Sequence, residues 1–245
     1  MARDVDDGAS RFLQHFARSL IDIRGLKAER AELFREVLYV AVLDALSKSV
    51  MPLREGNRDR FIYFLQRFCH WPDGDRVSLP HLYALVMLNP DPAFEKLRLW
   101  AVEKYRKLDP SGLPSINTDP KYDEVKALWP GSAEHRTPLR GVDLDALTHY
   151  RLLWVYRNML VHELRRPGRG MGFKEADEPY YHGMSDLDEN HNIAETTVEL
   201  IYPSKFLDRL CETALGALRR YFTENGINPY DSFVFGTYWI RELNR

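Results

Sequence analysis

Residues 144–166 read LDALTHYRLLWVYRNMLVHELRR, and this stretch decides the fold class. Its large apolar side chains recur at helical spacing and form one stripe: Leu147, Tyr150, Leu153, Trp154, Leu160, Val161 and Leu164. Asp143 is a suitable N-cap in front of the stretch, and Pro167-Gly168 behind it would end a helix. The stretch therefore predicts one long helix with a single apolar face, which is typical of a helical bundle.

The same periodicity recurs on both sides of this helix. It predicts further helices over residues 10–23, 27–50, 57–71, 82–88, 91–105 and 203–225. Residues 109–141 are interrupted by Pro and Gly, which predicts a long irregular connection with at most a short helix over 122–129. Residues 196–202 (TTVELIY) favour a β-strand that pairs near Tyr180-Tyr181, giving a hairpin within the acidic segment 175–202. The predicted fold class is mostly α: a helical bundle with a small β-hairpin insertion and a long irregular connection, in a single domain of residues 1–245.

The charge balance limits the kinds of partner. The 245 residues include 34 Lys and Arg against 36 Asp and Glu, so the net charge is -2, which argues against a protein that coats nucleic acid. That figure combines a basic block, residues 151–174, with an acidic block directly after it, residues 175–199, so a small local phosphate site stays compatible with it. No apolar run approaches the roughly 18 residues of a membrane span, so no membrane partner is expected. Cys69 and Cys211 lie far apart in no metal or disulfide pattern, which predicts a reducing, cytoplasmic compartment.

The segment from Arg157 to His162 (RNMLVH) is the strongest candidate site. Arg157 falls near the middle of the predicted apolar stripe, where an arginine is costly unless it is paired. Asn158 and His162 are four residues apart and share the neighbouring face. Because Arg157 and His162 lie about 140° apart on a helical wheel, one helix should not aim both at one small target. We therefore expect a homodimer in which two copies build a composite site.

A structural role is the alternative at these positions. Arg157 would then pair with a buried carboxylate such as Asp44, and His162 would be a surface histidine favoured by the dipole at the helix C-terminus. Glu163, next to His162, is a candidate supporting residue.

A basic, glycine-containing loop follows the motif and suits phosphate contacts, although a solvated helix end explains it equally well: Arg165, Arg166, Arg169 and Lys174. A second Arg-x4-His match, from Arg76 to His81, lies across a loop and is interpreted as coincidence. The spacing of His, Cys and acidic residues predicts no metal site, and no cofactor motif is present.

The chain resembles the HEPN superfamily of α-helical proteins, in which Arg-x4–6-His, often with a polar residue after the Arg, lies on a late helix. Arg157-Asn158-Met159-Leu160-Val161-His162 matches that signature, and residues 36–46 with 58–65 look like early helices of some members. The resemblance implies a metal-independent endoribonuclease that cleaves single-stranded RNA as a homodimer. It also implies a toxin or defence effector, held in check by an antitoxin-like protein. A non-catalytic helical module that binds RNA or protein is the alternative.

Overall fold

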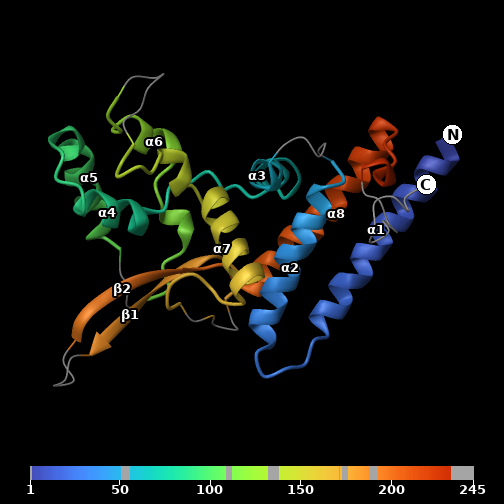
Figure 1. Ribbon diagram of the computed structural model, residues 1–245, viewed down its shortest axis with the longest axis horizontal. Coiled ribbons are helices and arrows are strands. Elements are labelled where there is room, and N and C mark those ends of the chain that lie inside the picture. Colours follow the sequence, from blue (N-terminus) through green and yellow to red (C-terminus); the bar gives the residue numbers. More distant parts are fainter. Residues whose placement is uncertain are drawn as a thin grey trace, which may run out of the picture. The chain divides into compact units, whose positions relative to one another are not determined.

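The computed structural model describes residues 2–50, 56–108, 112–131, 138–170, 172, 176–187 and 193–232. These residues form eight α-helices, four short 3-10 turns and one two-stranded antiparallel sheet (Figure 1). The helices are α1 (Ala2–Arg24), α2 (Ala31–Ser47), α3 (Asn57–Phe68), α4 (Leu79–Met87), α5 (Glu95–Tyr105), α6 (Tyr122–Lys126), α7 (His149–Glu163) and α8 (Ser204–Asn225). The strands are β1 (Tyr180–Leu187) and β2 (Ile193–Ile201), and the 3-10 turns are η1 (Pro92–Phe94), η2 (Ile116–Thr118), η3 (Leu144–Leu147) and η4 (Pro229–Asp231). The predicted class, mostly α with one small hairpin, is confirmed.

None of the helices in the described residues combines the length and the apolar character that crossing a membrane requires.

The chain divides into two compact units. One contains Met1–Trp71 and Leu207–Arg245, and the other contains Pro72–Phe206. The first unit therefore joins both ends of the sequence, whereas the second is one continuous segment. That the two units act as a single domain stays a prediction.

Aromatic side chains make up much of the core of the first unit. The predicted stripe of α1 is buried, and Phe12 packs edge-on against Phe222 of α8 with 6.0 Å between ring centroids. Phe68 of α3 also packs edge-on against Tyr221 of α8, with 5.2 Å between ring centroids. Because these rings remove large apolar surfaces from water, they stabilise the packing of the terminal segments.

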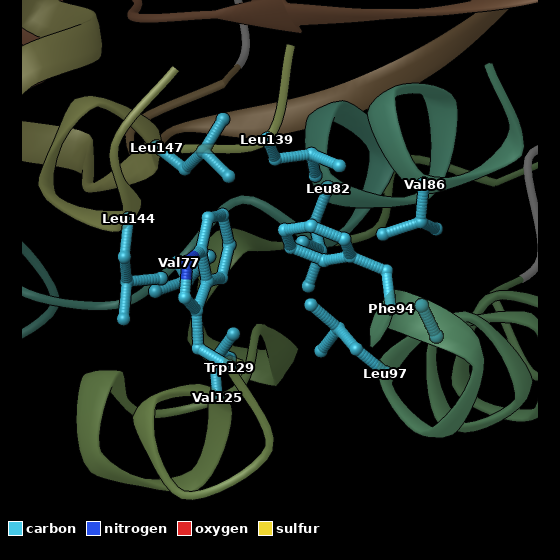
Figure 2. Close-up of a cluster of buried hydrophobic side chains, with 11 residues drawn as sticks. Val77, Leu82, Val86, Phe94, Leu97, Val125, Trp129, Leu139, Leu144 and Leu147 are labelled. Carbon is cyan, nitrogen blue, oxygen red and sulfur yellow. The ribbon is translucent and has the colours of Figure 1, made fainter. Parts of the chain in front are cut away.

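The second unit has its own hydrophobic cluster, formed around Phe94 and Trp129 (Figure 2). The two rings meet edge to face, 5.8 Å apart, and aliphatic side chains surround them. Val125, Trp129 and Leu139 of this cluster come from the segment that the sequence analysis describes as an irregular connection. The segment is irregular as predicted, with only η2 and α6 as helical turns, but it contributes directly to the core.

Helix α7 is shorter than the predicted helix over 144–166. It begins at His149 because the His149 and Tyr150 amides donate to the carbonyls of Arg76 and Gly74, at 3.1 and 2.8 Å. The preceding Thr148 is extended, and the Asp143 side chain caps neither α7 nor the turn η3. At the other end Leu164 adopts a left-handed conformation (φ 53°), so the helix stops before Pro167. Hydrogen bonds to a distant loop, which the local sequence does not encode, set the start of this helix.

The predicted hairpin is confirmed at its base. Tyr180 pairs with Ile201 and Tyr181 with Leu200, and the antiparallel register continues toward the tip with an irregularity near Asp186. Tyr180, Tyr181 and Ile201 are buried, so the base of the hairpin packs into the second unit and is not a solvated flap. The remaining acidic side chains near the tip lie outside the described side chains.

Candidate functional site

The three motif side chains on α7 lie together. One terminal nitrogen of Arg157, Nη1, donates to the Asn158 side-chain oxygen at 3.0 Å and lies 3.4 Å from Nε2 of His162. The expectation that one helix cannot bring Arg157 and His162 together is therefore wrong. The wheel angle ignores the length of the arginine side chain, which reaches around the helix surface to a residue five positions later.

The environment of Arg157 also differs from the expected centre of an apolar stripe. The buried face of α7 consists of His149, Tyr150, Leu153, Tyr156 and Leu160. Arg157 is half-buried at the edge of that face, with its guanidinium 5.1 Å from the centre of the Trp154 ring. A guanidinium over an indole face gains a cation–π attraction. Trp154 therefore holds the arginine stem while Nη1 points toward His162, which is exposed.

The other predicted site residues next to the motif lie at the end of α7 and just beyond it. Glu163 accepts from Arg165 at 2.8 Å, and both side chains are exposed. Arg166 is half-buried and Arg169 is exposed, whereas Lys174 lies outside the described residues. The described basic residues thus follow the motif in space as they do in sequence, but one of them is already paired with a glutamate.

Asp44, the candidate partner of Arg157, has cationic neighbours within the first unit. Its carboxylate lies 3.8 Å from Arg60 and 3.9 Å from Lys48. Arg60 is buried and also donates to the hydroxyl of Ser47 at 3.1 Å. Asp44 of α2 therefore offsets the charge of the buried Arg60 of α3, which is a structural role.

A cavity of about 150 Å³ lies within the second unit, beside the first turns of α7. We call it the α7 cavity. Its apolar walls are formed by Leu152, Val155, Tyr156, Pro167, Leu200 and Tyr202. Its polar groups are the His81 ring, the Glu199 carboxylate and the Gly168 backbone. Val155 is 48% exposed, so the cavity reaches the surface at this helix.

A chain of buried hydrogen bonds supports the His81 side of the cavity. His81 Nδ1 lies 2.7 Å from the Ser78 hydroxyl, which lies 2.7 Å from the Tyr181 hydroxyl. Tyr181 donates in turn to Asp119 at 2.6 Å. The chain links α4, β1 and the Pro-rich connection, so three distant segments fix the orientation of one histidine ring.

Asp119 is the central acceptor of this network. The same Oδ2 atom that accepts from Tyr181 also accepts from His149 Nε2 at 2.7 Å, and Oδ1 accepts from the backbone amide of Leu79 at 3.1 Å. His149 Nδ1 lies 2.9 Å from the hydroxyl of Tyr202, which lines the cavity. A fully buried carboxylate is tolerated here because three donors satisfy it.

The pKa shifts within the network favour the neutral forms of His81, Tyr181 and Tyr202. Burial lowers the pKa of His81 and the nearby His149 lowers it further, whereas Asp119 and Glu199 act in the opposite direction. Burial and the adjacent Asp119 raise the pKa of Tyr181 and of Tyr202 well above the ordinary value for a phenol. His81 is therefore favoured as a neutral imidazole beside two protonated tyrosines.

Sequence reasoning missed this second group of residues. It interpreted His81 as part of a coincidental match, and it took Asp119 as part of an irregular connection. The cavity and its network draw on residues from α4, the Pro-rich connection, α7, β1 and β2, so no short motif contains them. The β-prone pattern of 196–202 and the clustered tyrosines 180–181 were the available signals, because they place polar-tipped aromatic residues on a buried hairpin base.

Within the described residues, no group of three or more His, Cys, Asp or Glu side chains is arranged to hold a metal ion.

The chain matches no protein-family model, and neither the curated proteins nor the solved structures contain a match. The resemblance to the HEPN superfamily consequently stays a prediction.

Proposed function

We propose that the chain is a metal-independent endoribonuclease that cleaves single-stranded RNA, with Arg157, Asn158 and His162 as its catalytic residues. The observation that carries the proposal is the convergence of the three side chains around Arg157 Nη1. Arginine is suited to binding a phosphate, and histidine exchanges protons near neutral pH, so the pair combines the two functions that phosphodiester cleavage needs.

The contact geometry supports a role for His162 as the base. An arginine N–H can only donate, so its approach to Nε2 at 3.4 Å is favourable when that nitrogen carries a lone pair. His162 then carries its proton on Nδ1, and Nε2 is a base. Asn158 accepts from the same arginine and orients the guanidinium.

In the proposed reaction, His162 Nε2 takes the proton of the ribose 2′-hydroxyl, and the 2′-oxygen attacks the adjacent phosphorus. The bond from phosphorus to the 5′-oxygen breaks, and the protonated His162 passes its proton to that oxygen through solvent water, which regenerates the free base. Arg157 donates to the phosphoryl oxygens while negative charge develops on them. The products are a 2′,3′-cyclic phosphate and a free 5′-hydroxyl, and DNA is not a substrate because it lacks the attacking group.

The basic residues beyond α7 would extend the RNA contact. Arg165 would leave its exposed ion pair with Glu163 at little cost, since surface ion pairs contribute at most about 1 kcal/mol. Arg166, Arg169 and Lys174 complete the proposed substrate-binding set. Because a single helix already joins Arg157 with His162, the proposed chemistry does not require a second copy. A homodimer stays a prediction, which sedimentation velocity would test.

The surface around His162 also suits a protein partner. Val161 and Leu164, on either side of it along the chain, are 37% and 47% exposed. Apolar side chains next to a catalytic histidine would allow an inhibitory, antitoxin-like protein to cover the site, as expected for a cytoplasmic toxin or defence effector. The same surface favours the second candidate function, a non-catalytic module that binds RNA or protein through α7.

The decisive experiment compares purified wild type, His162→Ala and Arg157→Gln on a labelled single-stranded RNA in excess chelator. We expect each variant to cleave at least about 100-fold more slowly, while circular dichroism shows retained helix content. A histidine on α1 gives the matched control, and His15→Ala should cleave at the wild-type rate. A strand of the same sequence with 2′-deoxy sugars should resist cleavage by the wild type and by all three variants.

Equal rates for wild type and His162→Ala would contradict the catalytic proposal, and so would cleavage of the 2′-deoxy substrate. RNA binding without any cleavage by the wild type would favour the binding module. Overexpression gives an independent readout, since only the wild type should arrest growth.

A further inference from the structure

We infer that the α7 cavity binds a small organic cation: an amine, amidine or guanidinium group carried on an apolar stem. None of the described residues that line this cavity belongs to the proposed ribonuclease site, and the inference does not depend on it. Three properties of the cavity support it: the proton arrangement of His81, the position of Glu199 and the composition of the walls.

The hydrogen-bond chain behind His81 determines which ring nitrogen carries the proton. Tyr181 donates its only proton to Asp119, so its oxygen must accept from the Ser78 hydroxyl. Ser78 has then used its own proton, and at its contact with His81 it can only accept. His81 must therefore carry its proton on Nδ1. No described residue bonds to Nε2, so this nitrogen is a lone-pair acceptor on a ring that lines the cavity.

Glu199 provides the second acceptor. Its Oε1 accepts from the Thr197 hydroxyl at 2.9 Å, which fixes the carboxylate on strand β2. Its Oε2 lies close to Gly168, where the backbone has φ +64° and a Cβ would approach that oxygen to 2.0 Å. A glycine at this position allows the loop to pass tightly over the carboxylate. The negative group is held in place while it lines the cavity.

The described lining contains no lysine or arginine, so nothing in it neutralises Glu199. Phosphate or carboxylate ligands would meet a carboxylate and a lone pair, both repulsive to them. An N–H cation would satisfy both acceptors. The rings of Tyr156 and Tyr202 add apolar surface and aromatic faces that attract organic cations. With only two ligand-type side chains, His81 and Glu199, the lining falls short of the three or four that protein metal sites use.

The size of the cavity limits the ligand. A cavity of about 150 Å³ accommodates a single six-membered ring, as a protein cavity of that volume does for benzene. A longer ligand would extend past Val155 into solvent. The ligand class is therefore a cationic head on a ring-sized or short aliphatic stem.

Benzamidine is a suitable probe because it joins a ring to a cation with several N–H donors. Its binding to the purified full-length chain should be measured by titration calorimetry, beside neutral benzamide and anionic benzoate. We expect benzamidine to bind with Kd of about 1 mM or tighter, and the other two at least about 10-fold more weakly. In the wild type, the methyl NMR signals of Leu152, Val155 and Leu200 should shift on titration.

Glu199→Gln keeps an acceptor for Thr197 but removes the charge, so it should weaken benzamidine binding at least about 10-fold. The matched control is Glu103→Gln, an exposed carboxylate of α5 paired with Lys107, which should bind as the wild type does. Equal affinity for benzoate, unchanged binding by Glu199→Gln, or no shift of the cavity methyls would overturn the inference. The methyl shifts test it in the wild type, even if the Glu199 variant folds poorly.

Discussion

Replacing Asp119 by alanine should strongly destabilise the second unit. The carboxylate is 1% exposed and accepts from three buried donors: the Leu79 amide, the Tyr181 hydroxyl and Nε2 of His149. An alanine supplies no acceptor, and the site is too far from solvent for water to replace the carboxylate without rearrangement. Each donor then loses its partner in the folded state but recovers one when the chain unfolds.

The magnitude follows from the three donors. A buried donor left without a partner costs about 1–3 kcal/mol. Tyr181 can turn its hydroxyl toward Ser78, 2.7 Å away, so the cost of removing its acceptor on Asp119 lies at the low end of that range. We therefore expect the free energy of unfolding to fall by about 4 kcal/mol, a large share of the 5–15 kcal/mol typical of a domain. With a urea dependence of about 2–3 kcal/mol per M, the unfolding midpoint should drop by about 1.3–2 M.

The assay is urea unfolding followed by circular dichroism, with hydrogen exchange locating the loss. Exchange should accelerate in α4 and α7, which the network joins, while α1 and α2 of the first unit stay protected. The exposed carboxylate of Asp91, which caps η1 by accepting from the Ala93 amide at 2.9 Å, provides the control. Asp91→Ala should cost only about 1 kcal/mol.

A double-mutant cycle tests the assignment of the donors. Tyr181→Phe removes one donor, so Asp119→Ala should cost about 1–2 kcal/mol less in that background. If Asp119→Ala destabilised the chain no more than Asp91→Ala does, the buried network would not have the energetic role described here.

Two further predictions concern the first unit and the cavity histidine. Arg60→Ala should lower the free energy of unfolding by about 3 kcal/mol, because it removes the buried arginine that faces the Asp44 carboxylate. The control is Arg58→Ala, an exposed arginine of the same helix, which should change the free energy of unfolding by less than about 1 kcal/mol. Thermal unfolding of the two variants would distinguish these outcomes. Burial lowers the pKa of His81 below about 6.5, the value in an unfolded chain, so on acidification the unfolded state takes up the proton first. The stabilisation from neutral His81 is complete above about pH 6.5 and is lost as the pH falls below it. The urea midpoint should thus fall more between pH 7.5 and 5 for the wild type than for His81→Gln; equal slopes would contradict this account.

Most elements of this chain could be predicted because their signals are local. The apolar stripe of α1 lies within the helix predicted over 10–23, and the turn at Pro92 begins the segment predicted over 91–105. The start of α1 lies earlier than predicted, since the helix begins at Ala2 in a polar stretch. The hairpin base was predictable for the same reason, since residues 196–202 and Tyr180-Tyr181 are rich in the β-branched and aromatic residues that favour strands. The Arg157–His162 motif was found from its spacing together with its place on a predicted helix.

The sequence could not determine how far those two side chains reach. A helical wheel gives the direction of Cβ atoms but not the path of a long arginine side chain, so it placed Arg157 and His162 apart where the structure has Nη1 3.4 Å from Nε2. The first and last residues of α7 differ from the predicted ones for a related reason. Backbone hydrogen bonds to Arg76 and Gly74 decide where it begins, and such partners are chosen by tertiary folding.

The sequence by itself determined the helical class, the hairpin and the presence of a candidate Arg–His site, because periodicity, breakers and spacing act over short stretches. Tertiary folding alone brings His81 and Glu199, 118 positions apart, to the lining of one cavity, with Asp119 in the hydrogen-bond network behind His81. A buried carboxylate needs donors on every side, and a folded core supplies them from whichever segments surround it. For that reason the Pro-rich connection, irregular in sequence, contains the residue on which the network of the second unit depends.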